Sequence, residues 1–305
     1  MGRSAILLTI LACFLGILMN CIVIHTIEKK NQGPANQTVP DIFIFNLSIA
    51  DLLCLLSVPF LNHQLQGKGA WQFTATMCSI IMALHSNTQI VSTYVLTTMT
   101  VGRYLALMHH IRCNYIRTSY TARLAIRLVW AMSLFTIINI WMYTGLMPLP
   151  GGLMCYAVLL PNPSNDMYWF MLYECVCFFV LPLAIMGLAL FKILQNMTTS
   201  VAPLPARSLR ARIRRARMSL AICLAFFTCW VPYYILQLAR LWEHNPSAFT
   251  YAYNIAICMG YTNGCINPFL YITLSETFKR RFMKVVQPLK RKMRVAYRRR
   301  WQRQA

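Results

Sequence analysis

Residues 41–60 read DIFIFNLSIADLLCLLSVPF, a run of apolar side chains that begins with Asp41 and holds one further carboxylate, Asp51, near its middle. The run continues to residue 65 and exceeds the ~20 residues that a helix needs to cross the hydrocarbon core of a bilayer. An ionisable side chain at that depth is costly and usually faces the interior of a helix bundle. The stretch therefore predicts a membrane-spanning helix with a polar side turned towards other helices.

Six further stretches of the same kind lie along the chain. Together, the seven cover residues 5–27, 41–65, 76–108, 122–147, 167–195, 213–241 and 247–274. The third and sixth exceed the thickness of a bilayer, so these helices must tilt or project from it. Only 12% of the residues are charged, against about 25% in a soluble domain. We therefore expect an all-α membrane protein, with a seven-transmembrane helix bundle over residues 1–274 and a further segment over 275–305.

The distribution of basic residues between the stretches indicates the orientation. If the N-terminus is outside, the outer side holds only Arg3, Lys68 and Arg240, which is 3 of the 29 Lys and Arg residues. Basic residues concentrate in the cytoplasmic connections of membrane proteins. We expect a multi-pass protein of the plasma membrane with an extracellular N-terminus and a cytoplasmic C-terminus.

The net charge of +22 could indicate nucleic-acid binding, but the basic residues lie between apolar stretches and in the tail. This placement favours membrane lipids over nucleic acid. The cluster at 207–217 can anchor the chain at the inner leaflet, dock a cytoplasmic partner, or do both. Phe278 and Phe282 lie four residues apart among basic residues, which predicts a short amphipathic helix on the inner membrane face. The basic tail that follows is expected to lie against anionic lipid.

Five polar residues fall at similar depths in the first, second, third and seventh helices: Asn20, Asp51, Ser92, Asn263 and Asn267. They could share one polar centre that hydrates the Asp51 carboxylate or holds a sodium ion. They could instead act only as hydrogen-bonding contacts between helices, worth about 0.6 kcal/mol each. We favour the shared centre, because an isolated carboxylate in the membrane would be too costly. No Cys or His spacing typical of a zinc site occurs, and we expect no other metal and no cofactor.

The polar residues and the prolines form a set that resembles the class A (rhodopsin-like) G-protein-coupled receptors over the whole chain. The matching positions are Asn20, residues 46–51 (NLSIAD), Trp130, Pro182, residues 229–232 (CWVP) and residues 267–271 (NPFLY). The resemblance implies a disulfide between Cys78, at the outer end of the third helix, and Cys155 in the second outer loop. It also implies that ligand binding swings the inner half of the sixth helix outward. The cleft that opens would present Arg103, Tyr104 and Tyr271 to a G protein.

Within this family the chain most resembles the melanin-concentrating hormone receptors, and among them the type-one receptors. The matching stretches are residues 39–44 (VPDIFI), 148–152 (PLPGG), 160–163 (LPNP), 197–203 (MTTSVAP) and 232–238 (PYYILQL). The resemblance implies a neuropeptide ligand with basic and aromatic residues. It also implies coupling to heterotrimeric G proteins of the inhibitory or Gq type.

The expected ligand site is a pocket that opens outward between the third, fifth, sixth and seventh helices. Its candidate lining residues are His85, Gln89, Tyr173, Glu174, Trp230, Tyr233, Tyr234, Gln237 and Tyr261. Aromatic and amide groups around one charge suit a ligand with arginine and aromatic side chains. Each aromatic residue taken alone is more often a packing residue, whereas Gln237 needs a hydrogen-bond partner in its apolar helix.

Two positions depart from the family. The hormone receptors carry an aspartate in the third helix that pairs with an arginine of the peptide, where this chain has His85, which is mostly neutral at pH 7. We hypothesise that Glu174 supplies the negative charge and hydrogen-bonds to His85; alternatively, it points at lipid headgroups. The family motif Asp-Arg-Tyr reads Gly102-Arg103-Tyr104 here. Arg103 therefore lacks the acid that restrains the resting state, and we expect raised basal signalling.

Other functional classes fit the sequence less well. No arrangement of nucleophile, base and acid suggests an enzyme. Residues 247–275 contain no lysine that could form a retinal Schiff base. The repeats and interrupted helices of transporters are not evident. The alternative to a signalling receptor is a divergent receptor that binds a ligand or assists another protein without signalling, and a transporter is less favoured.

Overall fold

The structure is a computed structural model that describes residues 3–31, 37–66, 71–108, 118–149, 152–156, 165–199, 206–239, 246–276, 278–285 and 287. Within these ranges the chain forms seven long helical segments, as predicted. They are α1 (Arg3–Asn31), α2 (Val39–Gln66), α3 (Ala75–Met108), α4 (Ser119–Tyr143), a continuous segment of α5 (Asn165–Cys175), η3 (Val176–Val180) and α6 (Leu181–Thr199), then α7 (Ala206–Ala239) and α8 (Pro246–Leu274). The predicted basic tail beyond residue 287 and the side chains of residues 207–212 lie outside the described residues.

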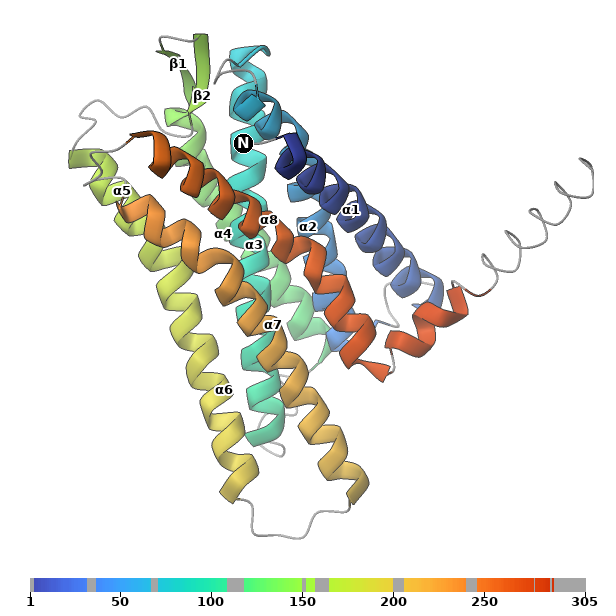
Figure 1. The fold of residues 1–305 in the computed structure, drawn as a ribbon. Coiled ribbons are helices and arrows are strands. Elements are labelled where there is room, and N and C mark those ends of the chain that lie inside the picture. Colours follow the sequence, from blue (N-terminus) through green and yellow to red (C-terminus); the bar gives the residue numbers. More distant parts are fainter. Residues whose placement is uncertain are drawn as a thin grey trace, which may run out of the picture.

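The helices stand side by side in one bundle (Figure 1). α8 packs against α7, α1 and α2, while α3 contacts α2, α4, α6 and α7. α1 begins at the end of the bundle that carries a hairpin of β1 (Gly145–Leu149) and β2 (Gly152–Tyr156), which we call the hairpin end. α6 ends and α7 begins at the opposite end, where a short helix follows α8; we call this the short-helix end (Figure 1).

Several helix ends differ from the predicted stretches by four residues or more, and two of these differences have a clear physical cause. The fourth helix ends at Tyr143 rather than at residue 147, because residues 145–149 leave the helix to form β1. The sixth helix begins at Ala206 rather than at residue 213. Its first turns are rich in Arg, Ala and Leu, which favour helix strongly, but hydropathy detects only the part of a helix that lies in lipid.

α3 is polar for a helix inside a membrane bundle. Five of the described helical segments have the length and hydropathy of a membrane span, and α3 and α8 are not among them. α3 satisfies its hydroxyl groups internally: the side chains of Thr88, Thr93 and Thr97 donate to the backbone oxygens four residues earlier at 3.0, 2.9 and 2.8 Å. Polar side chains of membrane helices usually face the bundle interior, which is where α3 lies.

The fifth span contains a π-turn, η3, that the sequence analysis did not predict. It immediately precedes Leu181 and Pro182, and proline has no backbone N–H to continue a regular helix. The backbone oxygen of Cys177 in this turn accepts a hydrogen bond from the Tyr94 hydroxyl on α3 at 2.8 Å. α3 therefore helps to hold the irregular turn in place.

The hairpin is fixed to α3 by a disulfide. β1 and β2 pair antiparallel, with Gly145 opposite Tyr156 and Leu149 opposite Gly152. The disulfide joins Cys155 of β2 to Cys78 of α3, with 5.6 Å between their Cα atoms, and confirms the predicted pair.

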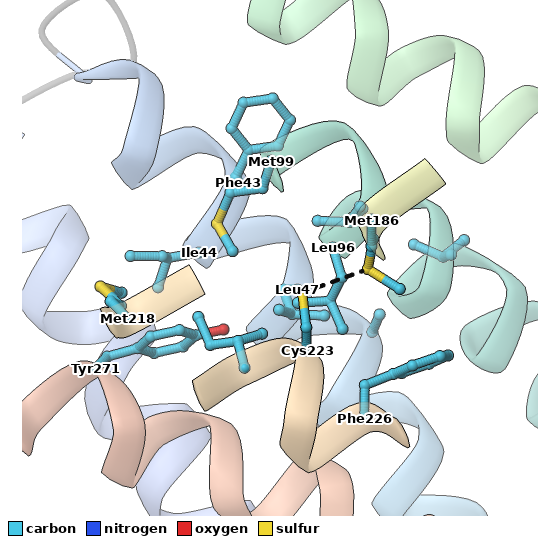
Figure 2. Packing of buried hydrophobic residues seen from close by; sticks show 14 of the residues in the cluster. Phe43, Ile44, Leu47, Leu96, Met99, Met186, Met218, Cys223, Phe226 and Tyr271 are labelled. Atoms are coloured by element: carbon cyan, nitrogen blue, oxygen red, sulfur yellow. Dashed lines mark hydrogen bonds between the residues drawn. The ribbon is translucent and has the colours of Figure 1, made fainter. Parts of the chain in front are cut away.

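Buried apolar side chains fill the bundle between α2, α3, α6, α7 and α8. Figure 2 shows Leu47, Leu96 and Phe226 in this cluster. The Sγ atom of Cys223 lies 3.8 Å from the Sδ atom of Met186 (Figure 2). Unbranched, polarisable sulfur side chains of this kind fill irregular gaps between helices.

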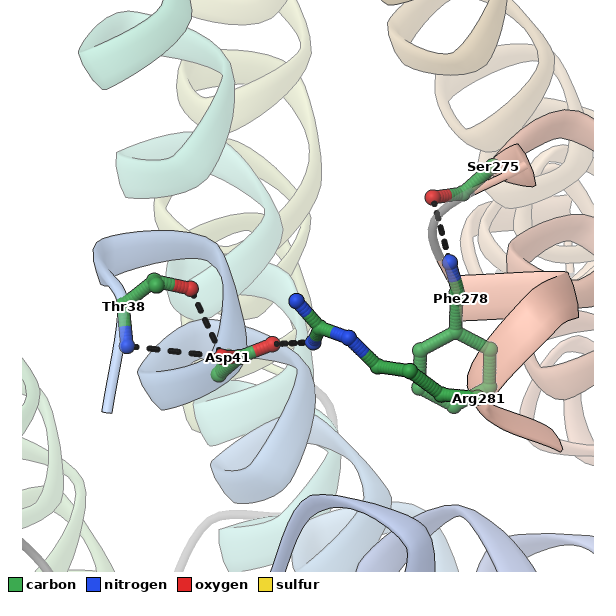
Figure 3. Close-up of polar contacts among 5 residues, drawn as sticks. All are labelled: Thr38, Asp41, Ser275, Phe278 and Arg281. Carbon is green, nitrogen blue, oxygen red and sulfur yellow. Dashed lines mark hydrogen bonds and ion pairs between the residues drawn. The ribbon is translucent and has the colours of Figure 1, made fainter. Parts of the chain in front are cut away.

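The helix after α8 is described over residues 278–285, and it confirms the predicted amphipathic helix. Phe278 is buried and meets Tyr271 edge to face, with 6.2 Å between ring centroids. The backbone N–H of Phe278 donates to Oγ of Ser275 at 3.3 Å (Figure 3), which caps the start of the helix. Lys279 and Lys284 are exposed on the other side.

Candidate functional site

Asp51 on α2 receives hydrogen bonds from two other helices. Ser92 of α3 donates to Oδ1 at 3.2 Å, and the Asn267 amide of α8 donates to Oδ2 at 2.9 Å. A Cβ atom at Gly264 would approach the Asp51 carboxyl carbon to 3.3 Å, so a side chain there would crowd the carboxylate. The structure thus brings together three of the five residues predicted to form a polar centre.

Asn20 and Asn263 do not bind the carboxylate. The Asn20 amide on α1 donates to the backbone oxygens of Gly16 and Gly264, each at 3.0 Å. The bond to Gly264 joins α1 to α8. Asn263 is 2% exposed. Its Oδ1, like that of Asn267, is buried without a hydrogen-bond partner among the described residues.

Four of the candidate pocket residues share one side of α7. Trp230, Tyr233, Tyr234 and Gln237 follow one another at the three- and four-residue spacing of a helix face. The rings of Tyr233 and Tyr234 meet edge to face at 5.1 Å between centroids, and those of Trp230 and Tyr233 at 5.8 Å. Gly260 on α8 makes room for the indole, because a Cβ there would lie 2.9 Å from the Trp230 ring. This side of α7 forms an aromatic column.

α3 contributes two of the candidate pocket residues. The Gln89 amide donates to the Tyr234 hydroxyl at 3.0 Å and joins α3 to the aromatic column. One turn earlier, His85 turns towards α2 and α8. Its ring meets that of Tyr261 edge to face at 5.3 Å, and its Nδ1 lies 3.9 Å from Sγ of Cys54.

Glu174 on α5 faces α7. Its Oε2 accepts a hydrogen bond from Nε2 of Gln237 at 2.8 Å, which confirms that Gln237 needed a partner. The predicted bond between Glu174 and His85 is not formed, because His85 faces α2 and α8. The alternative that Glu174 points at headgroups is also wrong, because its carboxylate turns into the bundle towards α7.

Tyr173 is the candidate pocket residue that lies outside the bundle. Its side chain is 48% exposed and shares a stripe with Trp169, Val176 and Val180, which are exposed to similar degrees. Tyr173 points away from the side that bears Glu174, because successive residues of a helix point about 100° apart. Tyr173 contacts Phe178, with 5.6 Å between ring centroids.

At the short-helix end, Arg103 of α3 reaches across to α7. Its Nη1 donates to Oγ of Ser219 at 2.8 Å, and its Nη2 lies 3.6 Å from Sδ of Met99 and 3.7 Å from Sδ of Met218. Arg103 is therefore partly restrained, because a serine of α7 accepts from the guanidinium, while the raised basal signalling expected from the missing acid stays a prediction. A Cβ atom at Gly102 would meet no atom within 4 Å, so space exists for the missing acid.

The two tyrosines predicted to meet a G protein lie at this end as well. Tyr104 is half-buried. Tyr271 on α8 is 0% exposed, and its hydroxyl has no hydrogen-bond partner among the described residues. In this arrangement Tyr271 faces the core beneath Phe278, not a cleft.

Two ion pairs at the short-helix end were missed by the sequence analysis. Arg281 donates to Oδ1 of Asp41 at 2.8 Å, and Asp41 also accepts from the Thr38 hydroxyl at 2.7 Å (Figure 3). Arg214 of α7 pairs with Glu276, directly after α8. The Arg281–Asp41 pair is largely shielded from solvent, with side chains 24% and 5% exposed, whereas the side chains of Arg214 and Glu276 are 41% and 71% exposed. Because the chain has few acids, each acid was a candidate partner for an ion pair. The sequence does not indicate which of the many basic residues each acid pairs with.

Comparison with known proteins agrees with this architecture. Residues 19–271 match the family described as 7 transmembrane receptor (rhodopsin family). The chain is 49% identical over 278 residues to melanin-concentrating hormone receptor 1 of Rattus norvegicus, covering 90% of this chain and 79% of that protein. It is 48% identical over 278 residues to the Homo sapiens receptor 1, with the same coverage. Identity to Homo sapiens melanin-concentrating hormone receptor 2 is 32% over 283 residues, which is 90% of this chain and 81% of that protein.

The helix bundle and the disulfide at the hairpin end point to the same class of protein as these similarities. The chain belongs to the rhodopsin family of seven-transmembrane receptors, in the branch that contains the melanin-concentrating hormone receptors, and it is a multi-pass membrane receptor of the G-protein-coupled class.

Proposed function

We propose that this receptor lies in the plasma membrane with its hairpin end outside and binds a neuropeptide that resembles melanin-concentrating hormone. The peptide carries basic and aromatic side chains. Binding activates a heterotrimeric G protein of the inhibitory or Gq type at the short-helix end. The names of the relatives support this proposal, and so does the excess of basic residues in the segments assigned to the cytoplasm.

One observation carries the proposal: α7 makes polar contacts both near the expected ligand pocket and near the expected G-protein cleft. Towards the hairpin end it presents Gln237 and Tyr234, which bond to α5 and α3. Towards the short-helix end the same helix presents Ser219, which accepts from Arg103. A ligand that rearranges the first two contacts changes the balance between the resting arrangement and one in which α7 leaves Arg103. The resting contact with α3 then opens to form the G-protein cleft.

The polar centre at Asp51 fits a sodium ion, which we include in the proposal. The carboxylate and the Ser92 hydroxyl offer oxygen ligands, and the buried side-chain oxygens of Asn263 and Asn267 have no hydrogen-bond donor among the described residues. Hard cations prefer such oxygen atoms. An ion bound there would add a positive charge beside Asp51 and so favour the resting packing of α2, α3 and α8.

We also propose that the short helix contacts anionic lipid. Phe278 fixes its apolar side to the bundle, while Lys279, Arg280 and Lys284 are partly or fully exposed. Each basic residue near an anionic membrane surface contributes about 1 kcal/mol. This contact would hold the start of the cytoplasmic segment against the inner leaflet.

The test is a signalling assay in cells that express the chain. Cyclic AMP and calcium are measured with and without melanin-concentrating hormone, after surface display has been verified with an N-terminal tag on intact cells. We expect a saturable hormone response that is lost in the Arg103→Ala variant displayed at the same level. Silence of the displayed wild-type chain would refute the proposal and favour a non-signalling receptor. A tag that is accessible only after permeabilisation would refute the orientation.

A further inference from the structure

The side-chain oxygen of Gln237 is buried without a hydrogen-bond partner in the part of the chain that the structure describes. Gln237 is only 5% exposed, and its Nε2 already donates to Glu174. That donation fixes the orientation of the amide and leaves Oε1 without a bond to the carboxylate. Buried polar atoms without a partner are rare and costly in native proteins. The free acceptor therefore indicates a donor that the described chain does not supply.

A carboxylate lies beside this acceptor. Among the acids that the structure describes, only Asp51 and Glu174 fall well inside a helical span. Asp51 already receives two hydrogen bonds from Ser92 and Asn267. From the residues that the structure describes, Glu174 receives one, from Gln237, and this bond involves only Oε2. The missing donor is thus expected to be positively charged.

Aromatic rings also lie close to Gln237 on α7. Tyr233 and Tyr234 lie one turn before Gln237 on the same side of α7, and their rings are 5.1 Å apart. The Tyr234 hydroxyl accepts from Gln89, which holds that ring in place. Aromatic faces attract guanidinium groups more often than ammonium groups.

We propose that Glu174 and Gln237 form the site for a guanidinium group of the ligand. The Glu174 carboxylate and the Gln237 amide oxygen each accept an N–H from the planar group. A guanidinium presents donors in a fixed fork that can meet two acceptors at once, whereas an ammonium is a compact point charge. Gln237 therefore sets the preference for arginine over lysine, and Glu174 supplies the charge.

This assignment rests on the proposed function, since it takes the ligand to be a peptide with basic side chains. It also explains how the chain functions with His85 in the third helix. His85 lies against Tyr261 and Cys54, and the anionic position has moved across the pocket from α3 to α5. The residue that supports it, Gln237, belongs to the helix whose movement the receptor uses.

The experiment is a double-mutant cycle that combines substitutions in the receptor with substitutions in the ligand. Binding is measured for melanin-concentrating hormone and for analogues in which each arginine is replaced in turn by citrulline, which keeps the shape without the charge, or by lysine. The receptors are the wild type, Glu174→Gln, Gln237→Leu and Glu28→Gln. The last is a matched control, because Glu28 is an exposed residue near the end of α1.

For one arginine, the wild type and Glu28→Gln should lose about tenfold to a hundredfold in affinity on replacement by citrulline, the range for a hydrogen bond to a charged group. Glu174→Gln should bind the hormone more weakly by a similar factor and show no further loss with that analogue. Gln237→Leu should lose the preference for arginine over lysine. Unchanged hormone binding by Glu174→Gln, or an unchanged citrulline penalty in that variant, would overturn the assignment.

A second measurement tests the site without the hormone. Thermal stabilisation of the purified receptor by arginine amide is compared with that by citrulline amide. We expect stabilisation of the wild type by arginine amide only, and none of Glu174→Gln. Equal stabilisation of both proteins would refute the site. If the hormone does not bind at all but arginine amide stabilises the wild type alone, the proposed peptide is wrong and the guanidinium site stands.

Discussion

Replacing Ser219 by alanine removes the oxygen that holds Arg103 in the resting arrangement. The bond is 2.8 Å long, its donor is charged, and Ser219 is 1% exposed. A hydrogen bond to a charged group contributes about 1.5–3 kcal/mol, and about 1.4 kcal/mol corresponds to a factor of ten. The equilibrium between resting and open arrangements should therefore shift about tenfold to a hundredfold. The sulfur atoms of Met99 and Met218 remain beside the guanidinium, but thioethers are weak acceptors.

The assay is ligand-independent nucleotide exchange on the G protein, in membranes that contain equal amounts of each receptor. Basal exchange should rise in Ser219→Ala by a factor in that range, up to the ceiling of full activation. Ser133→Ala is the matched control, because it removes a buried hydroxyl that accepts from Asn87 between α3 and α4. Equal basal exchange in wild type, Ser219→Ala and Ser133→Ala would refute the reasoning.

Three further predictions concern the same equilibrium. Gly102→Asp places an acid beside Arg103 in open space and should lower basal exchange by up to about fivefold, the value of an exposed ion pair; a higher basal rate than that of the wild type would contradict this. Arg214→Glu and Glu276→Arg should each raise basal exchange by up to about fivefold, and the double variant should restore it, because the pair joins α7 to the segment after α8; additive increases would exclude the pairing. Asp51→Asn should abolish the effect of sodium on hormone affinity measured against potassium, and a retained sodium effect would place the ion elsewhere.

Much of the fold could be predicted from the sequence, because lipid imposes a simple requirement. Each span needs about 20 residues that are mostly apolar, so the apolar stretches located the seven helical segments, including α3 and α8, whose hydropathy is lower than that of the other five. Spacing alone predicted the short helix from Phe278 and Phe282. The hairpin of β1 and β2 was missed because its residues are as apolar as the helix before it, and the early start of α7 was missed because basic residues can be helical outside the membrane.

The contacts within the site were harder to predict, because they depend on how each helix is rotated about its axis. An error of one residue turns a side chain by about 100°, which is why Tyr173 was assigned to the pocket although it lies outside. Trp169, Tyr173, Val176 and Val180 follow one another at the three- and four-residue spacing of one helix face, and all four are exposed. That spacing was a signal in the sequence that Tyr173 faces away from the bundle. No comparable pattern identified Ser219 as the partner of Arg103, since that contact joins residues far apart in the sequence.

The most direct test of the central claim is hormone-stimulated nucleotide exchange on a purified heterotrimeric G protein, in membranes containing the receptor. Inhibitory and Gq types are assayed in parallel, with Arg103→Ala at equal receptor density as the control. We predict a saturable rise in exchange with the wild type, for at least one type, and none with Arg103→Ala. No rise with either type, from a receptor that carries its Cys78–Cys155 disulfide and reaches the cell surface, would contradict the claim that this bundle couples a peptide to a G protein.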